Sequence, residues 1–306
     1  MATTILAGFS INLEVSFVFD GDSSEAKIPL QDATLRLAGS ALNTVTALSS
    51  LGVSPALIGL VDADPDPFGV IMKGLFGSVS CQHHLLPVLD RSGLAFLPIG
   101  GKVKRVIGRR GQVKECFLNQ AIAEVSRIRG EIGANICLAL GVTDGESELT
   151  KALFQDEASL RVLVPSKSLF FSSLPIEEIL GLTDFLFMSD YEYEASGLSV
   201  SQIHSFGVDL LVVTENSRGG WFSYHGTQMR YPAVSSNCVS EVGAGDWFLA
   251  AFLVKLTENQ EVLDYFSIEQ IESSLKFASL VAGMKVEHVG ASTGPTLEDI
   301  ARRLHD

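Results

Sequence analysis

The residues best suited to chemistry stand together in the segment Gly243-Ala244-Gly245-Asp246, directly before the apolar run from Trp247 to Leu256. Two glycines ahead of a helix let the backbone approach a ligand closely. The free amide groups of a helix N-terminus attract an anion such as a transferring phosphoryl group. An aspartate in the first helical turn can accept a proton from an attacking hydroxyl group. The segment therefore predicts phosphoryl transfer with Asp246 as the general base.

The same segment also has a simpler interpretation, in which a helix merely begins with Gly245 or Asp246 as its N-cap. Taken alone, the four residues leave both interpretations open. The chain contains no GxxxxGK sequence followed by Ser or Thr, which excludes the phosphate-binding loop of P-loop enzymes. Phosphoryl transfer by this chain would therefore depend on Asp246 and its two glycines.

The composition describes a well-cored globular protein of acidic character. The chain has 306 residues, of which 46% are hydrophobic and 19% are charged, and its formal net charge is −14. This length suits one large α/β domain. A nucleic-acid binder needs a basic stripe to displace counterions, and none is evident here. We therefore expect a small-molecule partner and no nucleic acid.

The densest basic cluster runs from Lys102 to Arg110 and includes Arg105. It suits a solvated hairpin, and the alternative is a position near an anionic substrate or product. The N-terminal segment has no basic residue before Lys27, and its apolar stretch is interrupted by polar residues, so no signal peptide or membrane span is expected. The four cysteines form no CxxC pair, which favours reduced thiols. We expect a soluble, cytoplasmic protein.

Apolar runs of strand length alternate with amphipathic helices over most of the chain. Because the strands read as continuous apolar runs, they predict a doubly wound α/β fold, with a mostly parallel sheet and helices on both faces. The expected helices include 40–51 and 267–285. The expected strands include 3–11, 56–61, 135–142, 161–165, 184–188 and 210–214.

Two stretches interrupt this rhythm with alternating polar and apolar residues, within 12–37 and 91–113. Such alternation is typical of exposed antiparallel strands. Together the two hairpins could form a small β-lid over the carboxyl ends of the parallel strands, where α/β proteins bind ligands. We therefore expect a single domain, 1–306, that carries such a lid.

Two segments in the right order resemble the signatures of the ribokinase-like, phosphofructokinase B type, carbohydrate kinases. The C-terminal one is the run from Gly243 to Phe252, and the N-terminal one runs from Ala38 through Asn43 to Gly52. The resemblance extends from Gly8 to Thr296. It implies an ATP- and Mg2+-dependent kinase in which Asp246 is the base and the amides of Gly243, Ala244 and Gly245 form the anion hole.

The resemblance also implies where a sugar would bind. Asn12 matches a substrate-binding strand end, where Glu14 replaces the usual aspartate, and Gly39 and Asn43 match a second substrate segment. Arg105 falls in a lid strand. Short polar side chains at the end of a buried strand are costly unless they are satisfied. A sugar's hydroxyl groups could satisfy them, and so could the backbone of the lid.

On the nucleotide side the match is looser. Ser189 replaces an asparagine in the family's Asn-x-x-Glu segment, while Glu192, which the family uses to organise magnesium, is retained. Three further residues match nucleotide-contacting positions: Thr214, Asn216, which replaces a glycine, and Gly219. Ser279 occupies the position at which the family has an asparagine near the adenine. The usual Asp-Thr ahead of the first glycine is Ser240-Glu241, which puts activation by potassium in doubt.

The resemblance predicts phosphorylation of a sugar or sugar-like alcohol. Two alternatives remain open. One is a nucleoside kinase, with Phe17, Phe19 and Phe96 lining an apolar slot, and the other is a sugar- or nucleotide-binding sensor without turnover. Several family members pair through their lids, and exposed strand edges need covering, so a homodimer through the lid is a further expectation.

Overall fold

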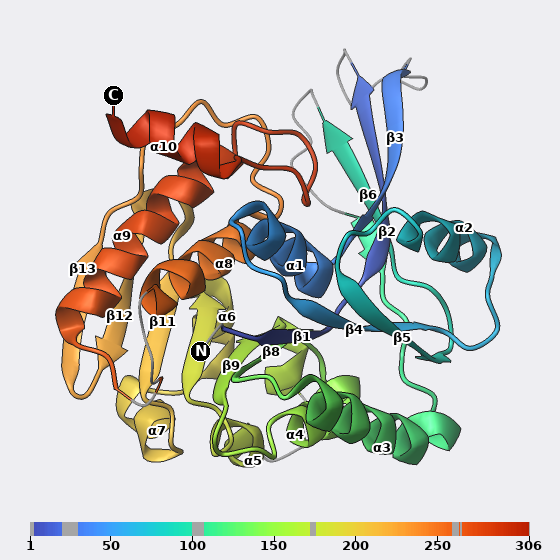
Figure 1. Ribbon diagram of the computed structural model, residues 1–306, viewed down its shortest axis with the longest axis horizontal. Coiled ribbons are helices and arrows are strands. Elements are labelled where there is room, and N and C mark those ends of the chain that lie inside the picture. Colours follow the sequence, from blue (N-terminus) through green and yellow to red (C-terminus); the bar gives the residue numbers. More distant parts are fainter. Residues whose placement is uncertain are drawn as a thin grey trace.

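The computed structural model describes residues 3–19, 30–99, 107–171, 176–258, 263 and 265–305. Its main element is a nine-stranded sheet with the order β13-β12-β11-β10-β9-β8-β1-β4-β5 (Figure 1). All neighbouring strands pair in parallel except β12 and β13, which form an antiparallel edge. The strands are β1 Ile5–Phe9, β4 Ala56–Asp62, β5 Gln82–Leu89, β8 Ile136–Val142, β9 Leu160–Pro165, β10 Phe185–Ser189, β11 Leu210–Thr214, β12 Gly220–Tyr224 and β13 Thr227–Tyr231.

Helices cover both faces of this sheet, so the predicted doubly wound class is confirmed. Short 3-10 turns lie at 144–146, 167–171 and 216–218, and none of the described helices is long and apolar enough to cross a membrane. The helices are α1 Ser40–Ser50, α2 Pro67–Phe76, α3 Glu115–Ile132, α4 Ser147–Leu153, α5 Ile176–Leu180, α6 Asp190–Ser196, α7 Val200–Ser205, α8 Ala244–Thr257, α9 Ile268–Lys285 and α10 Leu297–His305.

Two hydrophobic cores lie on opposite faces of the sheet because successive side chains of a strand point in opposite directions. On β1, Ile5 and Ala7 join the core under α1, α8 and α9, whereas Leu6 joins the core under α3, α4 and α7. Every residue of β1, β4 and β8 is buried. These central strands have no solvent face, which is why they read as continuous apolar runs.

The two predicted hairpins combine into one small sheet with the order β3-β2-β6-β7. It contains β2 Asn12–Phe19, β3 Leu30–Ala38, β6 Leu94–Ile99 and β7 Ile107–Arg109. Each hairpin is antiparallel, and the two are joined by a parallel pairing of β2 with β6. The small sheet stands beside α1 and α2 at one end of the main sheet (Figure 1). We call it the lid sheet.

Candidate functional site

Asp246 lies in the first turn of α8, where the sequence places it. The helix begins at Ala244, and its N-cap is Gly243, whose φ of 83° is left-handed. The cap is therefore Gly243, and the expected cap at Gly245 or Asp246 is wrong. A glycine is needed at 243 because a side chain disfavours this φ and because its Cβ would lie 2.3 Å from the carbonyl oxygen of Ala291. The chain behind the helix start is thus tightly packed.

The carboxylate of Asp246 is held by α1. Nδ2 of Asn43 donates a hydrogen bond of 2.7 Å to Oδ2 of Asp246, and the side chain of Ser40 also bonds this carboxylate. Burial raises the pKa of Asp246 to about 6, while these two hydrogen bonds and the positive charge of Lys285 oppose the rise. A pKa near the working pH is what a general base needs. The local environment therefore suits Asp246 to proton transfer.

The glycines on either side of Ala244 have different surroundings. A Cβ on Gly245 would meet no atom within 4 Å, so its backbone borders open space. The amide of Ala244, in contrast, donates to the carbonyl oxygen of Glu241 at 3.2 Å. Close approach of a ligand to this helix start is therefore easiest at Gly245.

A cleft of about 430 Å³ opens in front of Gly245. Four residues that the sequence assigns to nucleotide binding line this one cleft, together with Ala244 and Gly245. They are Thr214, Asn216, Gly219 and Ser279. They come from the carboxyl end of β11, the turn after it, and helix α9. The fold thus brings together residues that are far apart in the sequence, and the cleft ends at the turn that carries Asp246.

Asn216 adopts a left-handed backbone conformation of the kind that glycine favours. Its φ is 52°, in the left-handed region that asparagine tolerates better than most residues. Gly219, three residues later, has a φ of 82° and lies close to the backbone of Tyr231. A Cβ on Gly219 would lie 2.2 Å from the carbonyl oxygen of Tyr231. The turn between β11 and β12 therefore keeps a glycine-type geometry without a glycine at 216.

Ser189 and Glu192 form a capping box at the start of α6, beside the carboxyl end of β11. Oε2 of Glu192 accepts hydrogen bonds from both the amide and the hydroxyl of Ser189, each at 2.8 Å. Ser189 pairs with Thr214 in the sheet, so the cap adjoins the cleft. Neither Ser189 nor Glu192 is among the residues that line the cleft.

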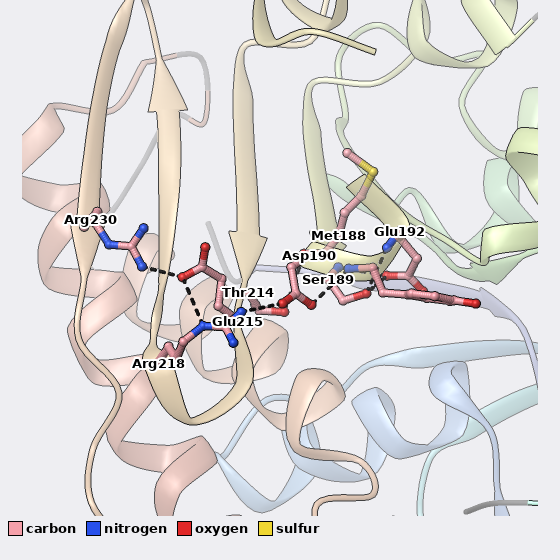
Figure 2. A network of polar contacts seen from close by, with 9 residues as sticks. Met188, Ser189, Asp190, Glu192, Thr214, Glu215, Arg218 and Arg230 are labelled. Carbon is pink, nitrogen blue, oxygen red and sulfur yellow. Dashed lines mark hydrogen bonds and ion pairs between the residues drawn. The ribbon is translucent and has the colours of Figure 1, made fainter. Parts of the chain in front are cut away.

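A chain of ion pairs links this cap to the turn after β11 (Figure 2). Arg218 donates to Asp190 at 2.7 Å and lies 3.9 Å from Glu215, which also pairs with Arg230 of β13. The network ties the turn after β11 both to α6 and to the edge strand. Because these arginines are largely exposed, we assign the network a positioning role and little stability.

The donor set around Glu192 is compatible with magnesium bound mainly by phosphates. No cluster of three His, Cys, Asp or Glu side chains that could hold a metal occurs within the part of the chain that the structure describes. Magnesium at nucleotide sites commonly uses one or two carboxylates together with substrate phosphates and water. The cap uses Oε2 of Glu192, so Oε1 is the oxygen that would face such an ion.

The residues assigned to the acceptor lie at the base of the lid sheet. Gly39 is the N-cap of α1, and a Cβ there would lie 2.5 Å from the carbonyl oxygen of Ser10. Oδ1 of Asn12, Oδ1 of Asn43 and Oε1 of Glu14 are buried and have no hydrogen-bond partner among the described residues. Buried polar atoms without partners are uncommon in native proteins. Three such atoms at predicted substrate positions fit a polar ligand.

Glu14 differs from the other predicted substrate residues because it is only 2% exposed and turns toward the loop after α9. Its carboxylate accepts a hydrogen bond from the amide of Ala291, and burial raises its pKa. Arg105 lies outside the described residues. Two described arginines lie close to it in the chain: Arg109, which pairs with Asp66, and Arg110, which donates to the carbonyl oxygen of Gly141 at 2.9 Å.

Two ionisable groups near the site were not singled out from the sequence. Glu146 lines a small pocket with Asn12 and Arg110, and it caps its own helical turn by accepting from Thr143. Lys285 is completely buried near Asp246. The sequence does carry a signal for Lys285, since it lies four residues after Val281 on the apolar stripe of α9.

The chain is similar to proteins of a known family. Residues 112–298, more than half of the chain, match the model of the pfkB family carbohydrate kinases. The chain belongs to the pfkB family. Ribokinase from Lactococcus lactis is 26% identical over 164 residues, which are 53% of this chain and 51% of that protein. The chain spans about half the length of this curated relative.

Solved structures of pfkB-type kinases share the fold over the whole length. A Burkholderia thailandensis nucleoside kinase in complex with inosine has a TM-score of 0.71 and 20% identity, covering 99% of this chain and 97% of its own. An Arabidopsis thaliana ribokinase complexed with ribose and ATP has a TM-score of 0.68 and 18% identity, covering 100% of both chains. At such low identity these likenesses establish the fold alone.

Proposed function

We propose that this member of the pfkB family transfers the γ-phosphoryl group of ATP to a hydroxyl group of a sugar or sugar-like molecule, within a single kinase domain that includes the lid sheet. The observation that carries the proposal is the hydrogen bond between Asn43 and Asp246. It holds a carboxylate whose pKa is raised to about 6 between the large cleft and the base of the lid sheet. A base in that position can reach both substrates.

In this mechanism Asp246 accepts the proton of the acceptor hydroxyl. The oxygen of that hydroxyl attacks the γ-phosphorus. The bond from the γ-phosphorus to the oxygen of ADP breaks, and ADP leaves. The backbone amides of Gly243 and Gly245 stabilise the charge that develops on the phosphoryl group, with Gly245 nearest to the open cleft, and the amide of Ala244, which bonds Glu241, would join them only by leaving that carbonyl oxygen. Magnesium, held by Glu192 and the phosphates, would screen the negative charge of the nucleotide.

The nucleotide occupies the 430 Å³ cleft in this proposal. Thr214, Asn216, Gly219 and Ser279 all line this cleft, which supports the proposal that they contact the nucleotide. The ATP in the Arabidopsis ribokinase complex supports this choice of donor. The acceptor binds at the base of the lid sheet, where Asn12 and Asn43 have unpaired oxygens. Arg105 stays a predicted acceptor ligand.

The proposal is tested by an ADP-release screen with ATP and Mg2+ over sugars, sugar acids, polyols and nucleosides. At least one acceptor should give turnover, and Asp246→Asn should reduce that turnover by about 10²–10⁴-fold while leaving ATP binding intact. Turnover that survives Asp246→Asn within a few-fold would remove Asp246 as the base. Ligand-induced thermal stabilisation without any ADP release would favour the sensor instead.

A nucleoside acceptor is the second candidate, because the Burkholderia relative was solved with inosine. Of the three residues expected to line an apolar slot, Phe17, Phe19 and Phe96, the pairing of the lid sheet puts Phe17 and Phe96 on the face opposite Glu14. Val15 pairs with Phe96, so Phe96 shares a face with Val15 and Phe17, whereas Glu14 projects from the opposite face, toward Lys285. A nucleoside base would therefore need other walls. Faster turnover of adenosine or cytidine than of ribose and fructose would favour this second candidate.

We propose a homodimer that covers the apolar face of the lid sheet. Four paired residues cross this sheet in one row, and three are large and exposed. They are Leu35 at 48%, Phe96 at 36% and Ile107 at 64%, with Val15 between Leu35 and Phe96. An apolar row is self-complementary, as a two-fold interface requires.

Light scattering should give a dimer for the wild type and for Leu304→Glu, a matched exposed leucine, and a monomer for Leu35→Glu/Ile107→Glu. A monomeric wild type at micromolar concentration would contradict the proposal.

A further inference from the structure

Lys285, the last residue of α9, has a side chain with an exposed fraction of 0%. Burying an ammonium group is unfavourable unless opposite charges and hydrogen-bond acceptors surround it. Nζ of Lys285 donates to the carbonyl oxygen of His288 at 3.4 Å, a long hydrogen bond. This single contact offsets little of the unfavourable burial of the ammonium group. The surrounding charges must therefore stabilise the lysine at this apolar position.

Charged groups from three different elements act on this ammonium. Glu14 of β2 and Asp246 of α8 attract it, Arg36 of β3 repels it, and the thiol of Cys238 lies in the loop before α8. Burial lowers the pKa of Lys285 to about 8, and the two carboxylates counteract that fall. With Arg36 and Lys285 positive and both carboxylates ionised, the cluster is electrically balanced.

The same charges fix the loop that follows α9. Glu14 accepts from the amide of Ala291, and Arg36 donates to the carbonyl oxygen of Val289 at 3.0 Å. Both groups lie against Gly290, where a Cβ would come within 2.0 Å of the guanidinium of Arg36. This loop is also the surface on which Gly243 rests, through Ala291. The charge cluster therefore supports the start of α8 from behind.

Asp246 depends on Lys285 for a positive charge. The groups that act on its carboxylate are Asn43 and Ser40 of α1, Glu192 of α6 and Lys285 of α9. Two of these are neutral donors, one is a like charge, and Lys285 alone among them is a cation. Without it, a desolvated carboxylate would face two hydrogen bonds and a second carboxylate.

We infer that Lys285 is a positioning residue for the proposed reaction, whose buried ammonium, with Glu14 and Arg36, holds the loop behind Gly243 and thereby sets the position and surroundings of the carboxylate of Asp246. This inference rests on the proposed function, since it concerns the readiness of the proposed base. A purely structural lysine would contribute to folding without changing the protonation of Asp246. The two roles can therefore be separated by titrating Asp246 itself.

The decisive measurement is the pKa of Asp246 by NMR of protein labelled with 13C at the aspartate carboxyl groups, with Asp246→Asn to assign the signal. In the wild type the pKa should be about 6. Lys285→Met keeps the aliphatic stem and removes the charge, and it should raise this pKa by about one unit. Lys276→Met, on the exposed side of the same helix, should leave it unchanged. An unchanged pKa in Lys285→Met would overturn the inference.

Two further steps keep the test decisive. If Lys285→Met does not fold, Glu14→Gln/Lys285→Met removes one charge of each sign and should show the same rise in the pKa of Asp246. With an acceptor from the screen, the acidic limb of kcat/KM should move up by the same amount, with recovery at higher pH. Because the NMR titration needs no acceptor, a wild type without turnover would overturn the proposed function, whereas the role of Lys285 would still be decided by the titration.

Discussion

Asn43 and Asp246 are 203 residues apart in the chain, and their side chains meet in a hydrogen bond of 2.7 Å. One stands in the first turn of α1 and the other in the first turn of α8, and these two helices pack against each other on the same face of the main sheet. The contact joins the segment assigned to the acceptor to the proposed base. It also predicts how the two residues depend on each other.

Removing the amide of Asn43 should make Asp246 harder to ionise. The hydrogen bond favours the charged form and opposes the rise in the pKa of Asp246 caused by burial. In Asn43→Ala the acidic limb of kcat/KM should move to higher pH, with a loss of about tenfold for each unit of the shift at pH values below it. Asn43→Asp should shift it further, because it adds a like charge. Asn119→Ala, at an exposed position of α3, should leave the pH profile unchanged, and an unshifted profile in Asn43→Ala would argue against the coupling.

The ionised carboxylate of Asp246 should lower the free energy of unfolding at neutral pH. The folded pKa of Asp246, about 6, lies above the ordinary value of 3.8, so the folded chain binds this proton more tightly than the unfolded chain. Its contribution to the free energy of unfolding is therefore lost as the pH rises from about 4 to about 6, and at neutral pH the ionised group costs on the order of 2–3 kcal/mol.

Asp246→Asn should consequently be more stable than the wild type at about pH 7.5, by up to that amount, and the gain should shrink toward pH 4. Urea unfolding of both proteins at the two pH values measures the difference. The amide can still accept the hydrogen bond of Asn43, so the local geometry is kept. A variant that is less stable than the wild type at pH 7.5 would show that ionised Asp246 does not destabilise the folded protein.

The two glycines of the segment should respond oppositely to alanine. Gly243→Ala places a Cβ 2.3 Å from the carbonyl oxygen of Ala291 at a φ of 83°, and we expect a loss of about 2–4 kcal/mol in the free energy of unfolding. Gly245→Ala meets no atom within 4 Å, so the fold should keep its stability while nucleotide turnover falls. Urea unfolding and ADP release on both variants separate packing from ligand approach. Equal losses of stability would contradict this division.

Cys238 offers a direct test of the nucleotide cleft. It is exposed and lines the cleft, whereas Cys116 is exposed on α3. ATP with Mg2+ should slow alkylation of Cys238 severalfold and leave the rate at Cys116 unchanged, as measured by mass spectrometry of the two peptides. Protection of neither cysteine at a saturating ATP concentration would place the nucleotide elsewhere. Equal protection of both would indicate a general tightening of the chain.

The sequence by itself determined the class of fold and the position of the proposed base. The continuous apolar runs predicted parallel strands buried on both faces, and six expected strands lie within a few residues of the observed ones. The glycines at 243 and 245 stood out because two glycines directly before an apolar helix let a ligand approach the backbone closely. These features are local, and residue types and spacing record local constraints directly.

Only the tertiary structure decided which polar groups face Asp246 and how the lid sheet is oriented. The parallel pairing of β2 with β6 joins two hairpins between which α1, β4, α2 and β5 lie in the sequence. It turns Phe17 and Phe96 away from the site and Glu14 toward Lys285. A lysine in an apolar stripe is visible in the sequence, but its partners come from β2, β3 and α8. Contacts between such distant segments depend on packing, for which residue spacing carries no signal.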